Sequence, residues 1–144
     1  VAALHCGRKG LEKRIIKNQI KIFNKIGSSR DDLIVAIGPS ISKNNYLVDK
    51  KTFKKFLNNS INHVYLSPEE KIENRFNSKN VDPSHNQELI KLDLRKYAYL
   101  QLLDEKISEK NIDISNLCTY KLENEFNSWR RSKTQSRQWN FICP

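Results

Sequence analysis

His5 stands in the stretch HCGRKGL, between an apolar run and a helical pattern. An imidazole there could bind a metal ion or act as a base. Gly7 and Gly10 allow a tight turn and a close approach of a ligand to the backbone. Unpaired N–H groups at the start of the next helix favour an anion, to which Lys9 adds charge. The stretch therefore permits an imidazole beside a phosphate-sized anion, and it also fits a structural histidine before a glycine turn.

A second candidate group is the set of arginines near the C-terminus, Arg130, Arg131 and Arg137. Arginine binds phosphate and carboxylate through two parallel hydrogen bonds, and the tryptophans on either side of the set could stack on a base. The alternative is a solvated loop in which the arginines pair with Glu123 and Glu125. The residues alone leave both interpretations open.

Ser40 and Ser42 lie in the turn IGPSIS, directly after a predicted strand. In an open α/β sheet, ligands usually bind at the carboxyl ends of the strands, which is also where His5 is expected. The Gly-Pro pair predicts a rigid turn, and the serines are candidates for ligand contact. No G-x-S-x-G motif is present, and no catalytic residue can be assigned.

Other metal ligands are hard to find in the sequence. Cys6 follows His5, but adjacent strand residues point to opposite faces, so we expect Cys6 in the core. His63 and His85 lie in a polar region without clear periodicity. A catalytic zinc takes three protein ligands, and nothing near His5 supplies the other two. The scattered cysteines, without a C-x-x-C pair, favour a reducing, cytoplasmic setting.

The formal charge of +10 comes mostly from lysines spread along the whole chain. Such spreading is typical of solvated surfaces, so nucleic acid is not the expected partner. No apolar run is long enough for a membrane span, and no signal peptide is visible.

The elements that position the candidate residues follow from hydrophobic periodicity. An apolar run at Val1–Leu4 predicts the end of a buried strand, and residues 11–26 predict an amphipathic helix capped by Gly27. In that helix Leu11, Ile15, Ile22 and Ile26 form the expected inner stripe, with Ile16, Ile20 and Phe23 beside it. Leu33–Ile37 predicts a second buried strand, which completes a β-α-β unit.

Further elements are predicted beyond this unit. We expect a short helix over 49–57 with Phe53, Phe56 and Leu57 inward, and a helix over about 93–110. Strands are expected over 113–120 and 139–142, and residues 58–87, with Tyr65, read as loops around short elements. The sequence predicts a mixed α/β (α+β) fold, a layered sandwich with a β-α-β core, as one domain over 1–144.

Five motifs in order resemble the YfiH-like, or laccase-domain, family. They are HCGRKGL, AIGPSIS with NNYLVD, LDLRKYAYLQLL, NLCTY and FNSWRRSKTQSRQWNFI. The resemblance implies a zinc-dependent purine nucleoside phosphorylase with adenosine deaminase activity. It makes His5 one of three zinc ligands. The other two family ligands, a histidine and a cysteine, precede this motif, so we expect an N-terminally truncated domain that is itself inactive.

The chain departs from the family motifs at several positions. Arg8 stands where the family has tryptophan, and Lys9 where it has arginine, which keeps the charge but loses the two-pronged fork. In the last motif the arginines are retained, while an aspartate and two glycines are replaced by Ser132, Lys133 and Ser136. The loop keeps its charge, but its shape is no longer implied by the resemblance.

The implied substrates are a purine nucleoside and phosphate, with attack at C6 of the base or C1′ of the sugar left open. Zinc would lower the pKa of bound water or orient phosphate. Alternatives are a copper polyphenol oxidase, an enzyme that edits cell-wall precursors, and a non-catalytic basic binding domain. Copper is the less favoured metal, because three scattered histidines do not form a multicopper cluster.

Overall fold

A computed structural model describes residues 1–60, 81–82, 87–136, 138 and 140–143 of the chain. The predictions for Tyr65, His63, His85, Arg137 and Trp139 lie outside these residues. None of the described helices is long and apolar enough to cross a membrane.

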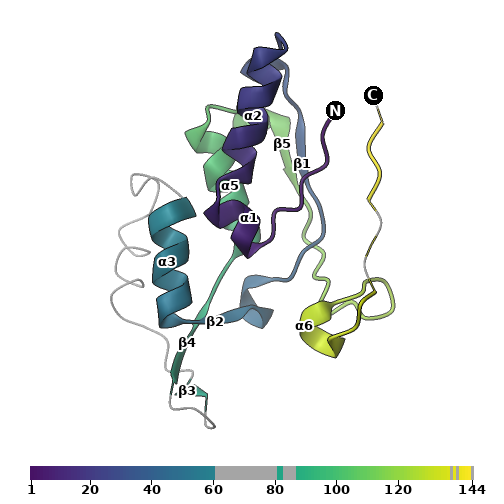
Figure 1. Ribbon diagram of the computed structural model, residues 1–144. Coiled ribbons are helices and arrows are strands. Elements are labelled where there is room, and N and C mark those ends of the chain that lie inside the picture. Colours follow the sequence, from purple (N-terminus) through teal and green to yellow (C-terminus); the bar gives the residue numbers. More distant parts are fainter. Residues whose placement is uncertain (61–80, 83–86, 137, 139, 144) are drawn as a thin grey trace.

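Two small sheets form the β structure (Figure 1). Strand β1 (Val35–Ile37) pairs in parallel with β5 (Ile112–Ile114), with Val35 opposite Ile112. In the second sheet, β4 (Gln87–Lys91) lies antiparallel between β2 (Leu47–Asp49) and β3 (Val81–Asp82). Short 3-10 turns η1 (Arg30–Asp32), η2 (Lys43–Asn45) and η4 (Glu109–Asn111) precede β1, β2 and β5. The mixed α/β class is confirmed.

The helices make most of the core. They are α1 (Arg8–Glu12), α2 (Ile15–Lys25), α3 (Lys50–Ser60), α5 (Leu94–Asp104) and the short α6 (Trp129–Ser132). Helix α1 packs on α2, α3 and α5, and α2 also packs on α5. The core residues come mainly from these helices, with Val48 from β2 and Leu92 from the residue directly after β4.

The short helix predicted over residues 49–57 is confirmed by α3, which spans Lys50–Ser60. Phe53, Phe56 and Leu57 are buried, and the Phe56 ring meets the edge of Tyr97 from α5 at 5.0 Å between centroids. Asp49 caps the helix: its Oδ1 accepts from Thr52 N at 2.7 Å and its Oδ2 from the Thr52 hydroxyl at 2.6 Å. Local capping and an apolar stripe are enough to specify this element.

Helix α5 begins where the sequence predicts and ends earlier. Asp93 is its N-cap, with Oδ1 accepting from Lys96 N at 3.1 Å. The helix stops at Asp104, because Lys106 takes a positive φ of 66° and turns the chain. Ile107, within the range predicted as helix, is buried although it lies beyond the helix.

The helix predicted over residues 11–26 is divided into two. Arg14 adopts the left-handed conformation, with φ 55° and ψ 46°, between α1 and α2. Two contacts from α5 hold this break: Gln101 Nε2 donates to Leu11 O at 2.8 Å, and Arg14 Nη2 pairs with Asp104 Oδ2 at 2.5 Å. Tertiary contacts therefore override the local helical pattern.

The break corrects the predicted inner stripe. Leu11, Ile16 and Ile20 are buried, whereas Ile22 and Ile26 are 51% and 71% exposed. In one straight helix, Ile22 and Ile26 would lie on the same face as Leu11. Because the helix axis changes direction at Arg14, they do not share that face in the structure. The cap at Gly27 is confirmed, with φ 90° and the paired hydrogen bonds Gly27 N to Asn24 O and Ser28 N to Phe23 O.

Two predicted strands are wrong. Val1–Leu4 forms no strand and Val1 is 69% exposed, while residues 140–142 form none and Phe141 is 86% exposed. Apolar composition predicted burial, but a strand also needs a partner for its backbone groups. In the described residues β1 pairs with β5 instead, and α3 and α5 lie in the connection between them. The parallel pair of a β-α-β arrangement is thus made by β1 and β5 rather than by Val1–Leu4 and β1.

Candidate functional site

His5 is exposed and lies just before α1, against two glycines. A Cβ built on Gly7 would lie 2.8 Å from His5 Nε2, and a Cβ on Gly10 would lie 2.8 Å from His5 O. Contacts that close are excluded for any other residue unless the histidine moves. The glycines predicted to allow a close approach therefore accommodate His5 itself, one its ring and the other its carbonyl.

The start of α1 is a poorer anion site than the sequence predicts. The helix has five residues, Gly7 is its N-cap, and the cap makes no side-chain hydrogen bond. Arg8 turns to Glu12 with a 3.1 Å ion pair, and the Lys9 side chain is exposed. A helix this short has little dipole, so Lys9 would act on an anion mainly through its own charge.

Ser40 is joined to the segment after β5. The two segments form a parallel bridge between Ser40 and Cys118, with Ser40 N donating to Leu117 O and Thr119 N donating to Ser40 O. The Ser40 hydroxyl oxygen is buried without a hydrogen-bond partner among the described residues. A buried hydroxyl without a hydrogen-bond partner costs free energy. Such a group is typical of a site where a polar atom contacts a bound ligand.

Cys118 lies beside Ser40 in a set of hydrogen-bond donors. Its Sγ lies 3.2 Å from Ser42 Oγ, and it accepts from Ser42 N at 3.3 Å and from Asn45 Nδ2 at 3.6 Å. Burial raises the pKa of this thiol, but hydrogen bonds from Ser42 and from backbone N–H groups outweigh burial and lower the pKa to about 7. The thiolate form is thus populated near neutral pH. By contrast, burial alone raises the pKa of Cys6, which packs partly against the core as predicted.

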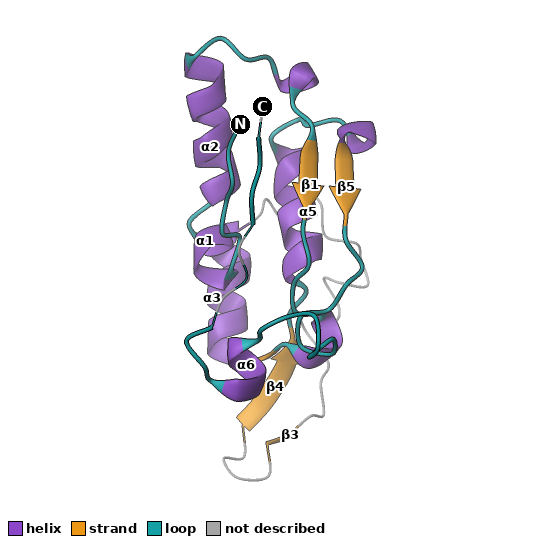
Figure 2. Ribbon diagram, turned by 90° about the vertical axis from the view of Figure 1, so that its right-hand side faces the viewer, coloured by secondary structure: helices purple, strands orange, loops and turns teal. Residues whose placement is uncertain are grey.

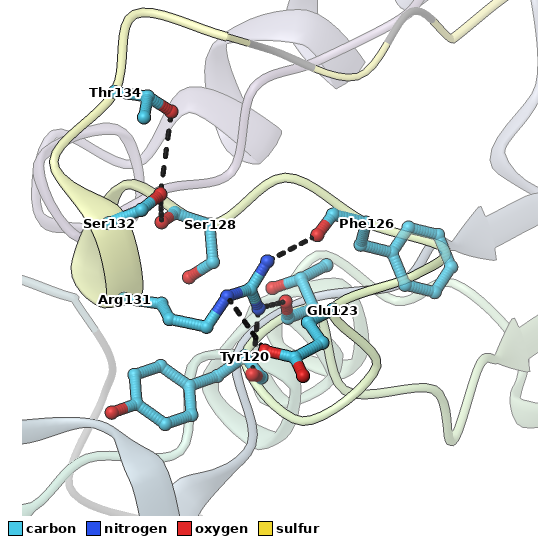
Figure 3. Close-up of polar contacts among 8 residues, drawn as sticks. Tyr120, Glu123, Phe126, Ser128, Arg131, Ser132 and Thr134 are labelled. Atoms are coloured by element: carbon cyan, nitrogen blue, oxygen red, sulfur yellow. Dashed lines mark hydrogen bonds and ion pairs between the residues drawn. The ribbon is translucent and has the colours of Figure 1, made fainter.

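The Arg131 side chain is hydrogen-bonded to backbone carbonyls of the segment that precedes it (Figure 3). Its Nη1 donates to Thr119 O at 2.9 Å and Tyr120 O at 2.8 Å, and its Nη2 donates to Phe126 O at 2.7 Å. Glu123 Oε2 lies 4.0 Å from its Nε. These contacts resemble the predicted alternative of arginine pairing with the glutamates, and they favour Arg131 as the residue that holds residues 119–126 in place.

Arg130 points to a different neighbour. Its guanidinium lies 4.9 Å from the centre of the Tyr46 ring, and its Nη2 is 3.4 Å from Leu47 O. The side chain is exposed, and its hydrogen bond to Leu47 O is long. Of the two described arginines, Arg130 keeps the greater capacity to bind an anion.

The loop around α6 keeps a glycine-like turn without the glycine. Lys133 has φ 56°, in the left-handed region that glycine favours, at a position where the family resemblance implies glycine. Its Nζ lies 4.0 Å from the centre of the exposed Trp129 ring. This cation–π contact offsets part of the backbone cost of the turn.

The predicted site residues therefore fall into two places. Ser40, Arg130 and Arg131 belong to one group of loops, formed by residues 40–47, 118–126 and 128–132, which we name the loop cluster. His5 and Lys9 lie at the start of α1, and within the described residues no hydrogen bond or ion pair joins them to the loop cluster. The same residues contain no group of three His, Cys, Asp or Glu side chains that could hold a metal ion.

The sequence did not reveal the donors around Cys118. Ser42 and Cys118 are separated by 76 positions, so no local spacing could show that they meet. Cys118 stood out only as a free cysteine within the motif NLCTY. The available signal was the run of small polar residues in IGPSISKNN. It predicts a turn and does not indicate that the turn contacts a thiol.

Comparison with known sequences gives a family match over the whole chain. Residues 1–144 match the family described as "Multi-copper polyphenol oxidoreductase laccase". The chain is 34% identical over 146 residues to Purine nucleoside phosphorylase slr1573 of Synechocystis sp., a match that covers 99% of this chain and 55% of the relative. It is 29% identical over 147 residues to Purine nucleoside phosphorylase YlmD of Bacillus subtilis, covering 99% of this chain and 46% of the relative.

The fold has a solved counterpart. The crystal structure of YlmD from Geobacillus stearothermophilus superposes with a TM-score of 0.70 at 26% sequence identity, over 88% of this chain and 42% of that one. The chain thus spans about half the length of the relatives it matches.

Proposed function

This chain belongs to the multi-copper polyphenol oxidoreductase laccase family, and from that we propose that it forms part of an enzyme that cleaves purine nucleosides with phosphate. The observation that carries the proposal is the 34% identity, over 99% of the chain, to a purine nucleoside phosphorylase. A second relative of the same name, from Bacillus subtilis, matches over the same share of the chain.

For phosphorolysis, an enzyme must bind the phosphate dianion beside the ribose and stabilise the leaving base. A phosphate oxygen attacks C1′, the N-glycosidic bond breaks, and the base leaves with its bonding electrons and takes a proton. The products are ribose 1-phosphate and the free base. Cations near the phosphate stabilise it in place and offset charge that develops in the transition state.

We assign the phosphate contact in the loop cluster to Arg130, with Ser40 as a hydroxyl donor. Arg130 is exposed and its hydrogen bond to Leu47 O is long, while the Ser40 hydroxyl lacks a partner among the described residues. Arg131 acts through the loop, because its guanidinium is held by three carbonyl oxygens. Lys9 adds charge from α1, and Arg137 remains a predicted phosphate contact outside the described residues.

Zinc dependence is a finer part of the proposal, and the described residues do not by themselves fit a zinc site. A catalytic zinc takes three protein ligands, whereas the described part of the chain contains no group of three His, Cys, Asp or Glu side chains that could hold a metal ion. The exposed His5 imidazole, backed by Gly7, could supply one nitrogen. Two further ligands would have to come from elsewhere in the enzyme.

One assay separates the possible activities. Adenosine is incubated with the enzyme that contains this chain, with and without inorganic phosphate. Phosphate-dependent release of adenine and ribose 1-phosphate supports phosphorolysis, whereas inosine and ammonia formed without phosphate would mean deamination. If neither product forms while zinc is present in excess, the proposal is wrong.

Variants of the same enzyme test the residue assignments. We expect Arg130→Ala to raise the KM for phosphate by about tenfold, in line with the loss of one charge-assisted hydrogen bond. His5→Ala should remove bound zinc, measured by elemental analysis beside the wild type. The matched control is Lys110→Ala on η4, which removes a surface charge remote in sequence from every assigned residue and should leave both values unchanged.

A further inference from the structure

Ser40 and Cys118 lie opposite each other where two loops meet. The loops follow β1 and β5, and Figure 2 shows these strands side by side, with the chain after both running toward the end of the molecule where α6 lies. The two residues form a parallel bridge, in which Ser40 N donates to Leu117 O and Thr119 N donates to Ser40 O. Residues that pair directly point to the same side of the paired segments. The Ser40 hydroxyl and the Cys118 sulfur therefore lie on one side of the joined loops.

The Cys118 sulfur carries a negative charge in part of the molecules near neutral pH. It accepts from Ser42 N at 3.3 Å and from Asn45 Nδ2 at 3.6 Å, and Ser42 Oγ lies 3.2 Å away. Hydrogen bonds from Ser42 and from backbone N–H groups lower the pKa of this thiol to about 7, despite its burial. The thiolate is the form of cysteine that attacks peroxides. Cys6 differs, because burial raises the pKa of its thiol.

The Ser40 hydroxyl is a separate indication that a further atom binds beside this sulfur. Its oxygen is buried and has no hydrogen-bond partner among the described residues. The Ser42 hydroxyl, by contrast, contacts both Asn45 and Cys118. A buried hydroxyl that lacks a partner costs free energy. An oxygen atom added to the Cys118 sulfur would supply an acceptor on the side of the bridge where this hydroxyl lies.

We propose that Cys118 is a modification site for hydroperoxides, at which its sulfur is oxidised to a sulfenic acid whose oxygen accepts a hydrogen bond from the Ser40 hydroxyl. The thiolate sulfur attacks the terminal oxygen of the peroxide, which keeps its hydrogen; a sulfur–oxygen bond forms and the oxygen–oxygen bond breaks. The other oxygen leaves with the electrons of that bond and takes a proton from water. The sulfur is oxidised by two electrons, and the peroxide is reduced to an alcohol or to water. This modification does not depend on the reaction proposed for the enzyme.

The test exposes the protein that contains this chain to hydrogen peroxide at pH 7.5, in a buffer without phosphate so that no phosphate competes for the loop cluster. Catalase stops the reaction, and the protein is then unfolded in urea with dimedone, which labels sulfenic acids regardless of their burial in the fold. Trypsin separates the cysteines, because Arg8 follows Cys6 while Lys110 and Lys121 lie on either side of Cys118. By mass spectrometry we expect Cys118 to be labelled more than about tenfold faster than Cys6.

Variants test the hydrogen bond from Ser40. Ser40→Ala should reduce the sulfenic acid found at Cys118 by about fivefold, as expected for the loss of one hydrogen bond. Ser40→Thr keeps a hydroxyl and should retain the wild-type amount. The matched control is Ser108→Ala, because Ser108 is also half-buried and its side chain makes no capping hydrogen bond to η4; it should be labelled as the wild type is. Circular dichroism verifies that each variant is folded.

Two results would overturn the proposal. The first is labelling of Cys118 no faster than that of Cys6, which is measured within the wild type and does not depend on how the variants fold. The second is equal labelling of Cys118 in folded Ser40→Ala and in the wild type, because the proposal places the new oxygen at the Ser40 hydroxyl.

Discussion

The packing of α3 on α5 and the loop cluster are held together by different forces. Around Phe56 the two helices meet through apolar side chains, and each helix is capped by an aspartate directly before it. In the loop cluster the central contacts are hydrogen bonds, from Arg131 to backbone carbonyls and from Ser42 and Asn45 to a thiol. The first region depends on area removed from water, and the second depends on directional donors that must each meet an acceptor.

The largest effect is expected at the centre of the helix pair. Phe56 is fully buried, so Phe56→Ala should lower the free energy of unfolding by about 3–5 kcal/mol through lost burial and a cavity. Urea denaturation followed by circular dichroism measures the change. Ile34→Ala is the control, since Ile34 is 88% exposed and the change should be within about 0.5 kcal/mol. A loss below about 1 kcal/mol at Phe56 would show that the two regions are not held by different forces.

The corresponding change in the loop cluster is Arg131→Ala. It leaves three carbonyl oxygens without their donor, and we expect a loss of about 2–4 kcal/mol. Arg131→Lys keeps the charge without the planar fork and should recover less than half of that loss. The comparison variant Arg130→Ala removes a neighbouring exposed arginine and should cost less than about 1 kcal/mol. Equal losses at the two arginines would contradict the structural role assigned to Arg131.

The difference between the regions also explains what the sequence could predict. Helix α3 was predicted with its inward residues, because capping and an apolar stripe are local signals. The break at Arg14 was not predicted, because Gln101 and Asp104 cause it from about ninety positions away. Val1–Leu4 was predicted as a strand from composition alone, although strand formation depends on a partner that composition does not specify.

The candidate site shows the same limit. The sequence predicts a close approach of a ligand at Gly7 and Gly10, whereas the structure places His5 itself, within five positions, against both glycines. The sequence could not assign separate roles to the two adjacent arginines, since Arg130 contacts Leu47, 83 positions away, whereas Arg131 donates to carbonyls only 5 to 12 positions away. The donors around Cys118 have the same origin, in a bridge between segments far apart in the chain.

A pH series tests the hydrogen bonds to the thiol. The folded pKa of Cys118, about 7, lies below its ordinary value of 9.0. Between these values the unfolded chain holds a proton that the folded chain has lost, so stability should rise from pH 7 to pH 9 and fall back as pH drops through 7. Two pKa units correspond to at most about 2–3 kcal/mol. Urea denaturation at pH 6, 7.5 and 9 measures the rise, which should be absent in Cys118→Ala; a rise that persists in the variant would come from another group.

The smallest effect is expected at the helix caps. Asp49 accepts two hydrogen bonds from Thr52, at 2.7 and 2.6 Å, whereas Asp93 caps α5 through the longer bond from Lys96 N at 3.1 Å. Asp49→Ala should therefore lower the free energy of unfolding by about 1–2 kcal/mol and Asp93→Ala by about 1 kcal/mol or less. The hydrogen bonds from Thr52 also lower the pKa of Asp49, so its contribution should persist above pH 4 and disappear as the carboxylate is protonated at lower pH.

Thr52→Ala separates the two bonds at this cap. It removes the hydroxyl donor and keeps the backbone N–H, so its cost should be smaller than that of Asp49→Ala. The double variant should cost less than the sum of the single variants, because both remove the same side-chain bond. Exact additivity in urea denaturation would mean that the Thr52 hydroxyl and the Asp49 carboxylate act separately. In that case Asp49 would resemble Asp93, which caps its helix through a bond from a backbone N–H.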